Sequence, residues 1–321
     1  MNYTFSPKEA YLIEQFTSLE FFEVMRSNYQ KFINELEELL EIYMHNLPYN
    51  LRSLPLPEQA DIVWGETVLP NLRETMQRIN IAYEKIKNGD FTYLFIAAEI
   101  RSNDKGMSEF SYHWLDDMPT EKVIECFKYH SLVGDYASVI ENTYPTYWEK
   151  GELDKIFPSA EIFHSIDIKL PDSYPIYKVN PSVQIHSNMK VVRTGIYISD
   201  TESQKIAFMA ASDEKDSGFA SSIGIQDSHT GEFIYHDCLW TLLERIADAG
   251  NTIADEGESL ETKKTRLKGY SGDICPESGN WWSPANQSQY HHFEKGEIFP
   301  KIENSEWGET VWYMEVNKQN D

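Results

Sequence analysis

Apolar side chains recur every three or four residues along the first half of the chain, a spacing that predicts amphipathic helices. One such stripe runs through residues 22–43, and the turn-forming sequence that begins at Pro48 ends this helix. A second stripe runs through residues 69–86, and it is followed by Gly89, which tolerates the left-handed conformation of a helix terminus. Two long helices with matching apolar stripes indicate an antiparallel pair inside a helical bundle.

Three further segments show helical spacing. One begins at Thr120, which we expect to cap the helix, and continues to Phe127. Another begins near Leu132 and ends before Pro145. The third covers residues 238–249, with apolar side chains at helical intervals before a terminating glycine.

The pattern changes near residue 158, where short runs rich in β-branched and aromatic residues alternate with polar turn sequences. The runs that predict strands lie at residues 161–168, 190–198, 205–211 and 232–236. Residues 267–316 are rich in Trp, Gly and Pro, and they predict a small β module of tight turns in which Gly296 adopts a positive φ.

These patterns predict an α+β fold in which a helical bundle packs on a β-rich second half. We place a helical domain at residues 1–157 and a β-rich domain, which includes the C-terminal module, at residues 158–321. No flexible linker separates the two halves, so they can also form one continuous body.

The charge balance excludes several classes of partner. The 321 residues include 28 Lys and Arg against 52 Asp and Glu, which gives a net charge of −24 with neutral His. Both halves share this excess, so the whole surface is acidic. Such a surface repels phosphate groups, and we therefore expect neither nucleic acid nor an anionic membrane as a partner.

Targeting signals and cysteine usage favour the cytoplasm. The start of the chain has no basic segment before an apolar one, so we expect no signal peptide. The longest apolar run, residues 93–98, is too short to span a bilayer. Cys126, Cys238 and Cys275 are odd in number and widely spaced, which favours buried reduced thiols over a disulfide framework.

No motif identifies a catalytic or cofactor site. The chain lacks GxxxxGK[ST], a GxGxxG after a strand, GxSxG and HExxH. Adjacent residues on a strand face opposite ways, so His291 and His292 are poorly placed to bind one metal ion. Acidic pairs such as Asp116-Asp117 are typical of solvated loops. We therefore expect no catalytic residue, no cofactor and no metal.

The C-terminal module carries the pattern GxxCPxSGxW, then HFxKGExFP, then WGETVWY. The residues of this pattern are Gly272, Cys275, Pro276, Ser278, Gly279, Trp281, Phe293, Gly296, Glu297, Pro300, Gly308 and Trp312. The pattern resembles the closing module of immunity proteins from bacterial polymorphic toxin systems, in particular immunity protein families 71 and 72. The helical first half and the segments RTGIYISD and WTLLERIADAG are also similar to those families.

This resemblance implies an antitoxin, not an enzyme, which neutralises a cognate toxin domain by stoichiometric binding. In toxin systems such as type VI secretion, the toxin would be the C-terminal part of a large secreted effector. The negative charge suits a basic target such as a nuclease toxin, because complementary charge speeds association.

We expect two acidic groups to contact the toxin: Glu37, Glu38 and Glu41 in the first group, and Asp213, Glu214 and Asp216 in the second. The alternative hypothesis is an enzyme or carbohydrate-binding protein. It requires a cleft between the two halves, lined by carboxylates and tryptophans. A structural component of a bacterium or phage is a third hypothesis.

Overall fold

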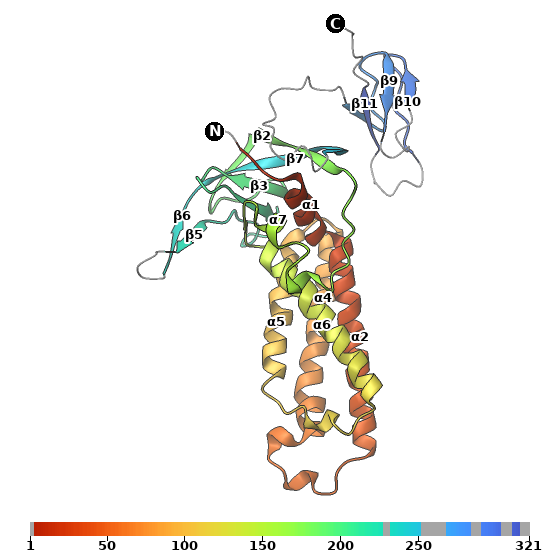
Figure 1. The fold of residues 1–321 in the computed structure, drawn as a ribbon, viewed down its shortest axis with the longest axis vertical. Coiled ribbons are helices and arrows are strands. Elements are labelled where there is room, and N and C mark those ends of the chain that lie inside the picture. The colour runs from red at the N-terminus through yellow and green to blue at the C-terminus, as the bar shows by residue number, and fades with distance from the viewer. Residues whose placement is uncertain (1–2, 227–231, 252–267, 284–289, 303–309, 315–321) are drawn as a thin grey trace. The chain divides into compact units, whose positions relative to one another are not determined.

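The computed structural model of the chain describes residues 3–226, 232–251, 268–283, 290–302 and 310–314. The chain folds into two compact units, Met1–Ile246 and Ala247–Asp321. Helices dominate up to Ile156 and antiparallel strands dominate beyond it, which confirms the α+β class (Figure 1). The compact units divide at residue 246, whereas the predicted boundary at residue 157 marks only the change from helices to strands.

The first unit begins with a helical bundle. Its helices are α1 (Pro7–Phe16), α2 (Leu19–His45), α3 (Ala60–Val63), α4 (Leu69–Lys87), α5 (Ile96–Met107), α6 (Thr120–Thr143) and α7 (Glu152–Ile156). Short turns connect them: η1 (Leu51–Ser53), η2 (Leu56–Glu58), the π-turn η3 (Trp64–Val68), η4 (Phe91–Phe95), η5 (His113–Leu115) and η6 (Glu161–Phe163). Figure 1 shows α2, α4, α5 and α6 side by side.

The two long helices predicted from the apolar stripes are confirmed as α2 and α4. Ser18 caps α2 by accepting a hydrogen bond from the N–H of Phe21 at 3.1 Å, and the apolar stripe of the helix is buried. At the end of α4, Gly89 adopts φ +92°, as expected after a helix terminus. Contacts at both ends of the pair, Arg26 with Asn80 and Glu37 with Arg73, show that α2 and α4 are antiparallel.

The helix after Pro119 is longer than predicted. The segments predicted to begin at Thr120 and near Leu132 form one continuous helix, α6, because no Pro or Gly separates them. The predicted cap at Thr120 was wrong, because Thr120 is the first helical residue and Pro119 occupies the cap position without a side-chain bond.

The first unit also contains a five-stranded sheet in the order β1-β4-β3-β7-β2, although the last five residues of β7 fall in the second unit. Its strands are β1 (Trp148–Glu149), β2 (Tyr174–His186), β3 (Gly195–Ser199), β4 (Lys205–Met209) and β7 (Leu239–Asn251). Along β3, Ile196 and Ile198 pack into the helical core, while Tyr197 packs into a second cluster on the opposite face with Trp240. The sheet is therefore buried on both faces, and α1 packs against the face that meets the bundle.

The helix predicted at residues 238–249 was wrong, because this segment is β7. Trp240 and Leu242 pack in the second cluster, on the face of the sheet away from the bundle, which we call the outer cluster. Leu243 packs in the helical core. A strand covered on both faces has no alternation of apolar and polar residues. Its apolar positions coincided with a helical spacing, and pairing with β3 decided the conformation.

The other strand predictions succeeded in part. Residues 205–211 and 232–236 contain β4 and β6 (Phe233–His236), and the run at 190–198 contains only the first part of β3. The strand predicted at residues 161–168 was wrong. Phe163 instead packs its ring on Phe16 at 5.8 Å, within a short connection over the helical core. β1, β2 and β5 (Ile223–Gln226) were not predicted.

The second unit contains the predicted C-terminal β module. Its strands follow the order β10-β9-β11-β8, with β8 (Lys268–Tyr270), β9 (Gly279–Trp282), β10 (Tyr290–Phe293) and β11 (Val311–Met314). Cys275, Trp281, Phe299 and Trp312 form its buried core. Gly296 adopts φ +98°, which confirms that prediction, while Gly308 of the sequence pattern lies outside the described residues.

Candidate functional site

The acidic group predicted on α2 is largely paired within the bundle. Glu37 accepts a hydrogen bond from Arg73 of α4 at 2.6 Å, and Glu38 pairs with Lys122 of α6 at 2.6 Å. Glu41, one turn further along, is exposed. The first two charges therefore link helices, and Glu41 is the member of this group most open to a partner.

The second predicted group lies on the loop after β4. Glu214 accepts a hydrogen bond from the Tyr93 hydroxyl at 2.7 Å and pairs with Lys85 at 3.5 Å. The hydrogen bond to Glu214 raises the pKa of Tyr93. Asp213 and Asp216 are exposed.

The two acidic groups do not form one site. Arg73, which pairs with Glu37, and Lys85, which pairs with Glu214, both lie on α4. Twelve residues separate these partners, which corresponds to about 18 Å along a helix. A partner that contacts Glu41 therefore approaches the molecule at a different place from one that contacts Asp213.

Glu41 belongs to a surface that we call the bundle end, which consists of residues 41–68 and 111–121. Two connections between helices pack together there: the indole of Trp64 donates a hydrogen bond to the carbonyl of Ser111 at 3.1 Å, and its ring lies 5.5 Å from that of Trp114. The ring of Tyr43, at the end of α2, lies 5.5 Å from that of Trp114 on another side. A buried aromatic cluster thus joins the connections into one surface, at the end of the bundle away from the sheet (Figure 1).

The loop on this surface is held in one conformation. Arg52 donates hydrogen bonds to both carboxylate oxygens of Asp61, and Gln59 donates to the carbonyl of Leu54 at 2.8 Å. The Arg52 guanidinium holds the pKa of Asp61 below its ordinary value. Three prolines between residues 48 and 57 restrict the backbone further. A loop fixed in this way loses little conformational entropy when it binds a partner.

The bundle end combines exposed apolar side chains with acidic ones. Tyr49 is fully exposed, and Leu56 and Met44 are more than half exposed. The surface carries seven carboxylates and a single arginine, Arg52. The carboxylates belong to Glu41, Glu58, Asp61, Glu66, Asp116, Asp117 and Glu121, and all except Asp61 are exposed. Apolar anchors surrounded by charges of one sign are typical of a surface that binds a protein of the opposite charge.

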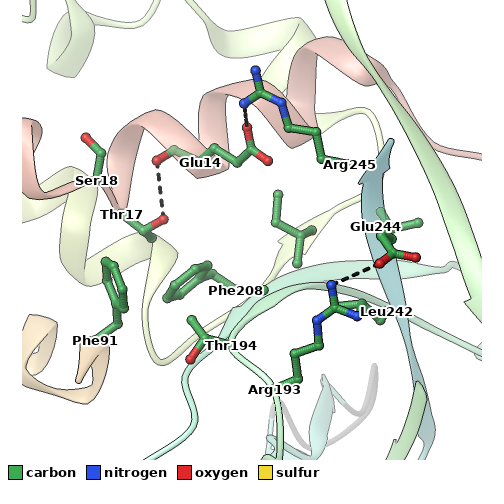
Figure 2. Close-up of a pocket in the computed structure, with 13 residues that line it drawn as sticks. Glu14, Thr17, Ser18, Phe91, Arg193, Thr194, Phe208, Leu242, Glu244 and Arg245 are labelled. Carbon is green, nitrogen blue, oxygen red and sulfur yellow. Dashed lines mark hydrogen bonds and ion pairs between the residues drawn. The ribbon is translucent and has the colours of Figure 1, made fainter. Parts of the chain in front are cut away.

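A pocket of about 330 Å³ lies in the first unit between α1 and the sheet (Figure 2). Glu14 of α1 accepts a hydrogen bond from Arg245 of β7 at 2.8 Å, and Arg193 donates one to Glu244 at 2.9 Å. The rings of Phe91 and Phe208 form part of the apolar lining of the pocket. Thr17 and Ser18, directly after α1, also line it. Each lining carboxylate is therefore paired with a guanidinium, and the Glu14–Arg245 pair links α1 to β7.

The three cysteines are buried and reduced, as predicted. On β10, His292 contacts Asn280 at 3.1 Å, whereas the His291 ring lies against Trp312, so these histidines face opposite ways. Within the described ranges, no cluster of three His, Cys, Asp or Glu side chains could hold a metal ion. No helix there is long and apolar enough to cross a membrane.

The sequence prediction includes Glu41 of the bundle end but none of its exposed apolar side chains. The turn-forming sequence after α2 indicates only the end of a helix. The available signal was the leucines, tyrosine and prolines between acidic residues in this segment. Apolar residues occur both inside proteins and on their surfaces, so only the packing shows that these are exposed.

Comparisons with family models, with curated proteins and with solved structures found no match to this chain. The bundle end and the charge of the chain are thus the observations from which a function can be argued.

Proposed function

We propose that this chain is a toxin-neutralising immunity protein that binds a basic toxin domain in a stoichiometric complex, in the cytoplasm, without catalysis. The bundle end is the surface we assign to that contact. The observation that carries the proposal is the coincidence of exposed Tyr49, Leu56 and Met44 with six exposed carboxylates on one preorganised surface. The resemblance to immunity protein families 71 and 72 supports the same conclusion.

The charge of the chain favours a basic target. At a net charge of −24, two copies repel each other, whereas a cationic domain is attracted over a distance of about 8–10 Å in physiological salt. Complementary charge raises association rates by one to three orders of magnitude, and apolar anchors then hold the complex. Rapid capture of a lethal enzyme is the property that an antitoxin needs.

The experiment is a pull-down with the tagged full chain from its native host, washed at about 0.05 M and about 0.5 M salt. We expect one dominant partner at near one-to-one stoichiometry, the C-terminal part of a large secreted protein. Expression of that partner should arrest growth, and co-expression of this chain should restore it. A partner that is not toxic, or toxicity that this chain leaves unchanged, would overturn the proposal.

Charge reversal locates the surface. In the variant with Glu58→Lys, Glu66→Lys and Asp117→Lys, we expect the association rate constant at low salt to fall at least tenfold. The matched control reverses three exposed carboxylates outside the bundle end, Glu74, Asp213 and Asp216, and should change that rate far less. Equal effects of the two variants would mean that overall charge, not the bundle end, drives association.

The pocket supports a second candidate function, small-ligand or carbohydrate binding, because its lining comes from both the helical and the β-rich half of the chain. The experiment adds each member of a panel of mono- and oligosaccharides to the full chain and measures the melting temperature (Tm) of the chain. Arg193→Ala, which removes the ion pair to Glu244, should abolish any increase in Tm. If no saccharide raises the Tm, this candidate is rejected.

A further inference from the structure

The β5–β6 hairpin is an arm with an open edge. β5 and β6 pair only with each other in the described part of the chain, in an antiparallel register that places Gly224 opposite Tyr235 and Gln226 opposite Phe233. Figure 1 shows this hairpin projecting from the five-stranded sheet. Isolated two-stranded hairpins have marginal stability in water, so a projecting one needs a local anchor.

Tyr147 supplies that anchor and occupies one edge. Its hydroxyl donates a hydrogen bond to the Gly224 carbonyl at 3.0 Å and accepts one from the Gly224 N–H at 2.9 Å. Ile223, at the base of the hairpin, is completely buried. The base of the hairpin is thus fixed to the body of the first unit, and the outer edge of β5 is covered at Gly224.

The hydrogen bonds between Tyr147 and Gly224 also show which backbone groups of β6 point away from β5. Because the N–H and carbonyl of Gly224 point outward, Gly224 and Tyr235 form a pair without hydrogen bonds between them. The N–H and carbonyl of Tyr235 therefore also point outward, and those of Phe233, two residues earlier, do the same. Outside the hairpin ladder, no hydrogen-bond partner for these four groups occurs among the described residues.

Apolar side chains cover both faces of this edge. Phe233 is 60% exposed and Tyr235 is 73% exposed on one face, and Ile225 and Ile234 lie opposite each other on the second face, both about half exposed. Native proteins commonly protect an exposed edge with lysines, prolines or bulges. The described residues of β6 carry none of these, so its edge is suited to accept another strand.

The charge of the sequence that contains the hairpin indicates the kind of strand. Residues 216–240 contain no Lys or Arg, and their four acidic residues are Asp216, Asp227, Glu232 and Asp237. A second copy of this chain would bring the same negative charge to the contact, which opposes pairing. An extended segment with alternating basic and apolar residues would match both the charge and the apolar faces.

We propose that the outer edge of β6 binds an extended basic segment of another protein by strand addition, with Phe233 and Tyr235 as side-chain contacts. This site is separate from the bundle end and does not depend on the toxin proposal. Backbone hydrogen bonds give the contact its geometry, and the exposed rings and isoleucines give it apolar area.

The test uses the full chain and a synthetic end-blocked peptide of alternating Val and Lys as the probe. We expect binding that slows amide hydrogen exchange at Phe233 and Tyr235 in NMR spectra and leaves exchange at Ile234 unchanged. The control peptide has the same sequence with every backbone nitrogen methylated, which retains charge and side chains but removes the donors. Its binding should be at least tenfold weaker.

Two variants separate the contribution of the Tyr235 backbone N–H to peptide binding from that of its side chain. Tyr235→Pro removes the outward N–H at an edge position, where proline is tolerated, and should weaken binding at least tenfold. Tyr235→Thr keeps the N–H and should weaken binding less. No binding, equal binding of the methylated peptide, or protection located outside β6 would overturn the proposal. Dimerisation of the chain that Tyr235→Pro abolishes would also overturn it, in favour of a second copy as the occupant.

Discussion

Glu9 is a completely buried carboxylate that joins α1 to the start of α7. It accepts hydrogen bonds from the backbone N–H groups of Gly151 at 2.9 Å and Leu153 at 3.0 Å. Burial is the largest influence and raises the pKa of Glu9 from 4.5 to about 6, although the two N–H groups act in the opposite direction. We predict that the stability of Glu9→Gln relative to the parent chain increases as the pH rises from 4 to 7.

The magnitude and sign follow from proton linkage. Below pH 4.5, Glu9 is protonated in both the folded and the unfolded state, and its ionisation costs nothing. Between pH 4.5 and 6 the folded state keeps the proton that the unfolded state has lost, so stability falls as the pH rises. Above pH 6 the folded state holds a buried charge. At 1.36 kcal/mol per pH unit, this charge costs about 2 kcal/mol.

Glutamine is uncharged like the protonated side chain, but its amide nitrogen cannot accept the second backbone N–H, so Glu9→Gln should be less stable than the parent chain at pH 4. Between pH 4 and pH 7 the variant should gain about 2 kcal/mol relative to the parent chain. The assay is urea unfolding followed by far-UV circular dichroism, which reports the helices of the first unit. Exposed Glu74→Gln is the matched control and should show no such pH-dependent difference. If the stability difference between Glu9→Gln and the parent chain is the same at pH 4 and pH 7, burial does not raise the pKa of Glu9 and the reasoning is wrong.

Three further outcomes test the packing and the proposed surface. Trp240→Ala removes a completely buried indole from the outer cluster of the sheet and should lower the free energy of unfolding by about 3–5 kcal/mol in the same assay. Gly269→Ala places a methyl group 2.3 Å from the ring of Phe299, so the free energy of unfolding of the C-terminal module should fall by about 1–3 kcal/mol, measured by tryptophan fluorescence. An unchanged unfolding midpoint would mean that the ring moves aside. Tyr49→Ser alters a fully exposed side chain, so unfolding should change by less than about 0.5 kcal/mol while affinity for the partner recovered from the host falls at least tenfold, measured by calorimetry.

The sequence predicted the bundle well because the apolar stripes of α2 and α4 are local signals. A helix that buries one side needs apolar residues at fixed intervals, and these intervals are visible without a structure. The prediction failed at β7 because a strand buried on both faces has no comparable pattern. Trp240 and Leu243 belong to opposite clusters, and only the neighbouring strand β3 determines this.

The candidate surface could be predicted only in part for a related reason. Charge can be counted along the chain, so acidic groups that include Glu41 can be predicted as contacts, but the partners of Glu37 and Glu38 come from helices distant in sequence. Exposure of Tyr49 depends on how the loop after α2 folds, and the bond between Arg52 and Asp61, which helps to fix that loop, is not visible in the apolar pattern. A binding surface consists of side chains that stay exposed or unpaired after folding. Which side chains these are depends on the tertiary structure.

The bundle end and the β5–β6 hairpin make different demands on a partner. α2 runs from the sheet to the bundle end, and its 27 residues span about 40 Å. A standard interface covers about 800 Å² on each protein, a patch roughly 30 Å across, so one compact contact does not reach both surfaces. A partner that uses both must carry an extended segment of at least about twelve residues, at about 3.3 Å per residue. The contributions of the two surfaces would then differ in kind. The acidic bundle end would set the association rate and its salt dependence, whereas strand addition at β6, which relies on backbone hydrogen bonds, would set the dissociation rate.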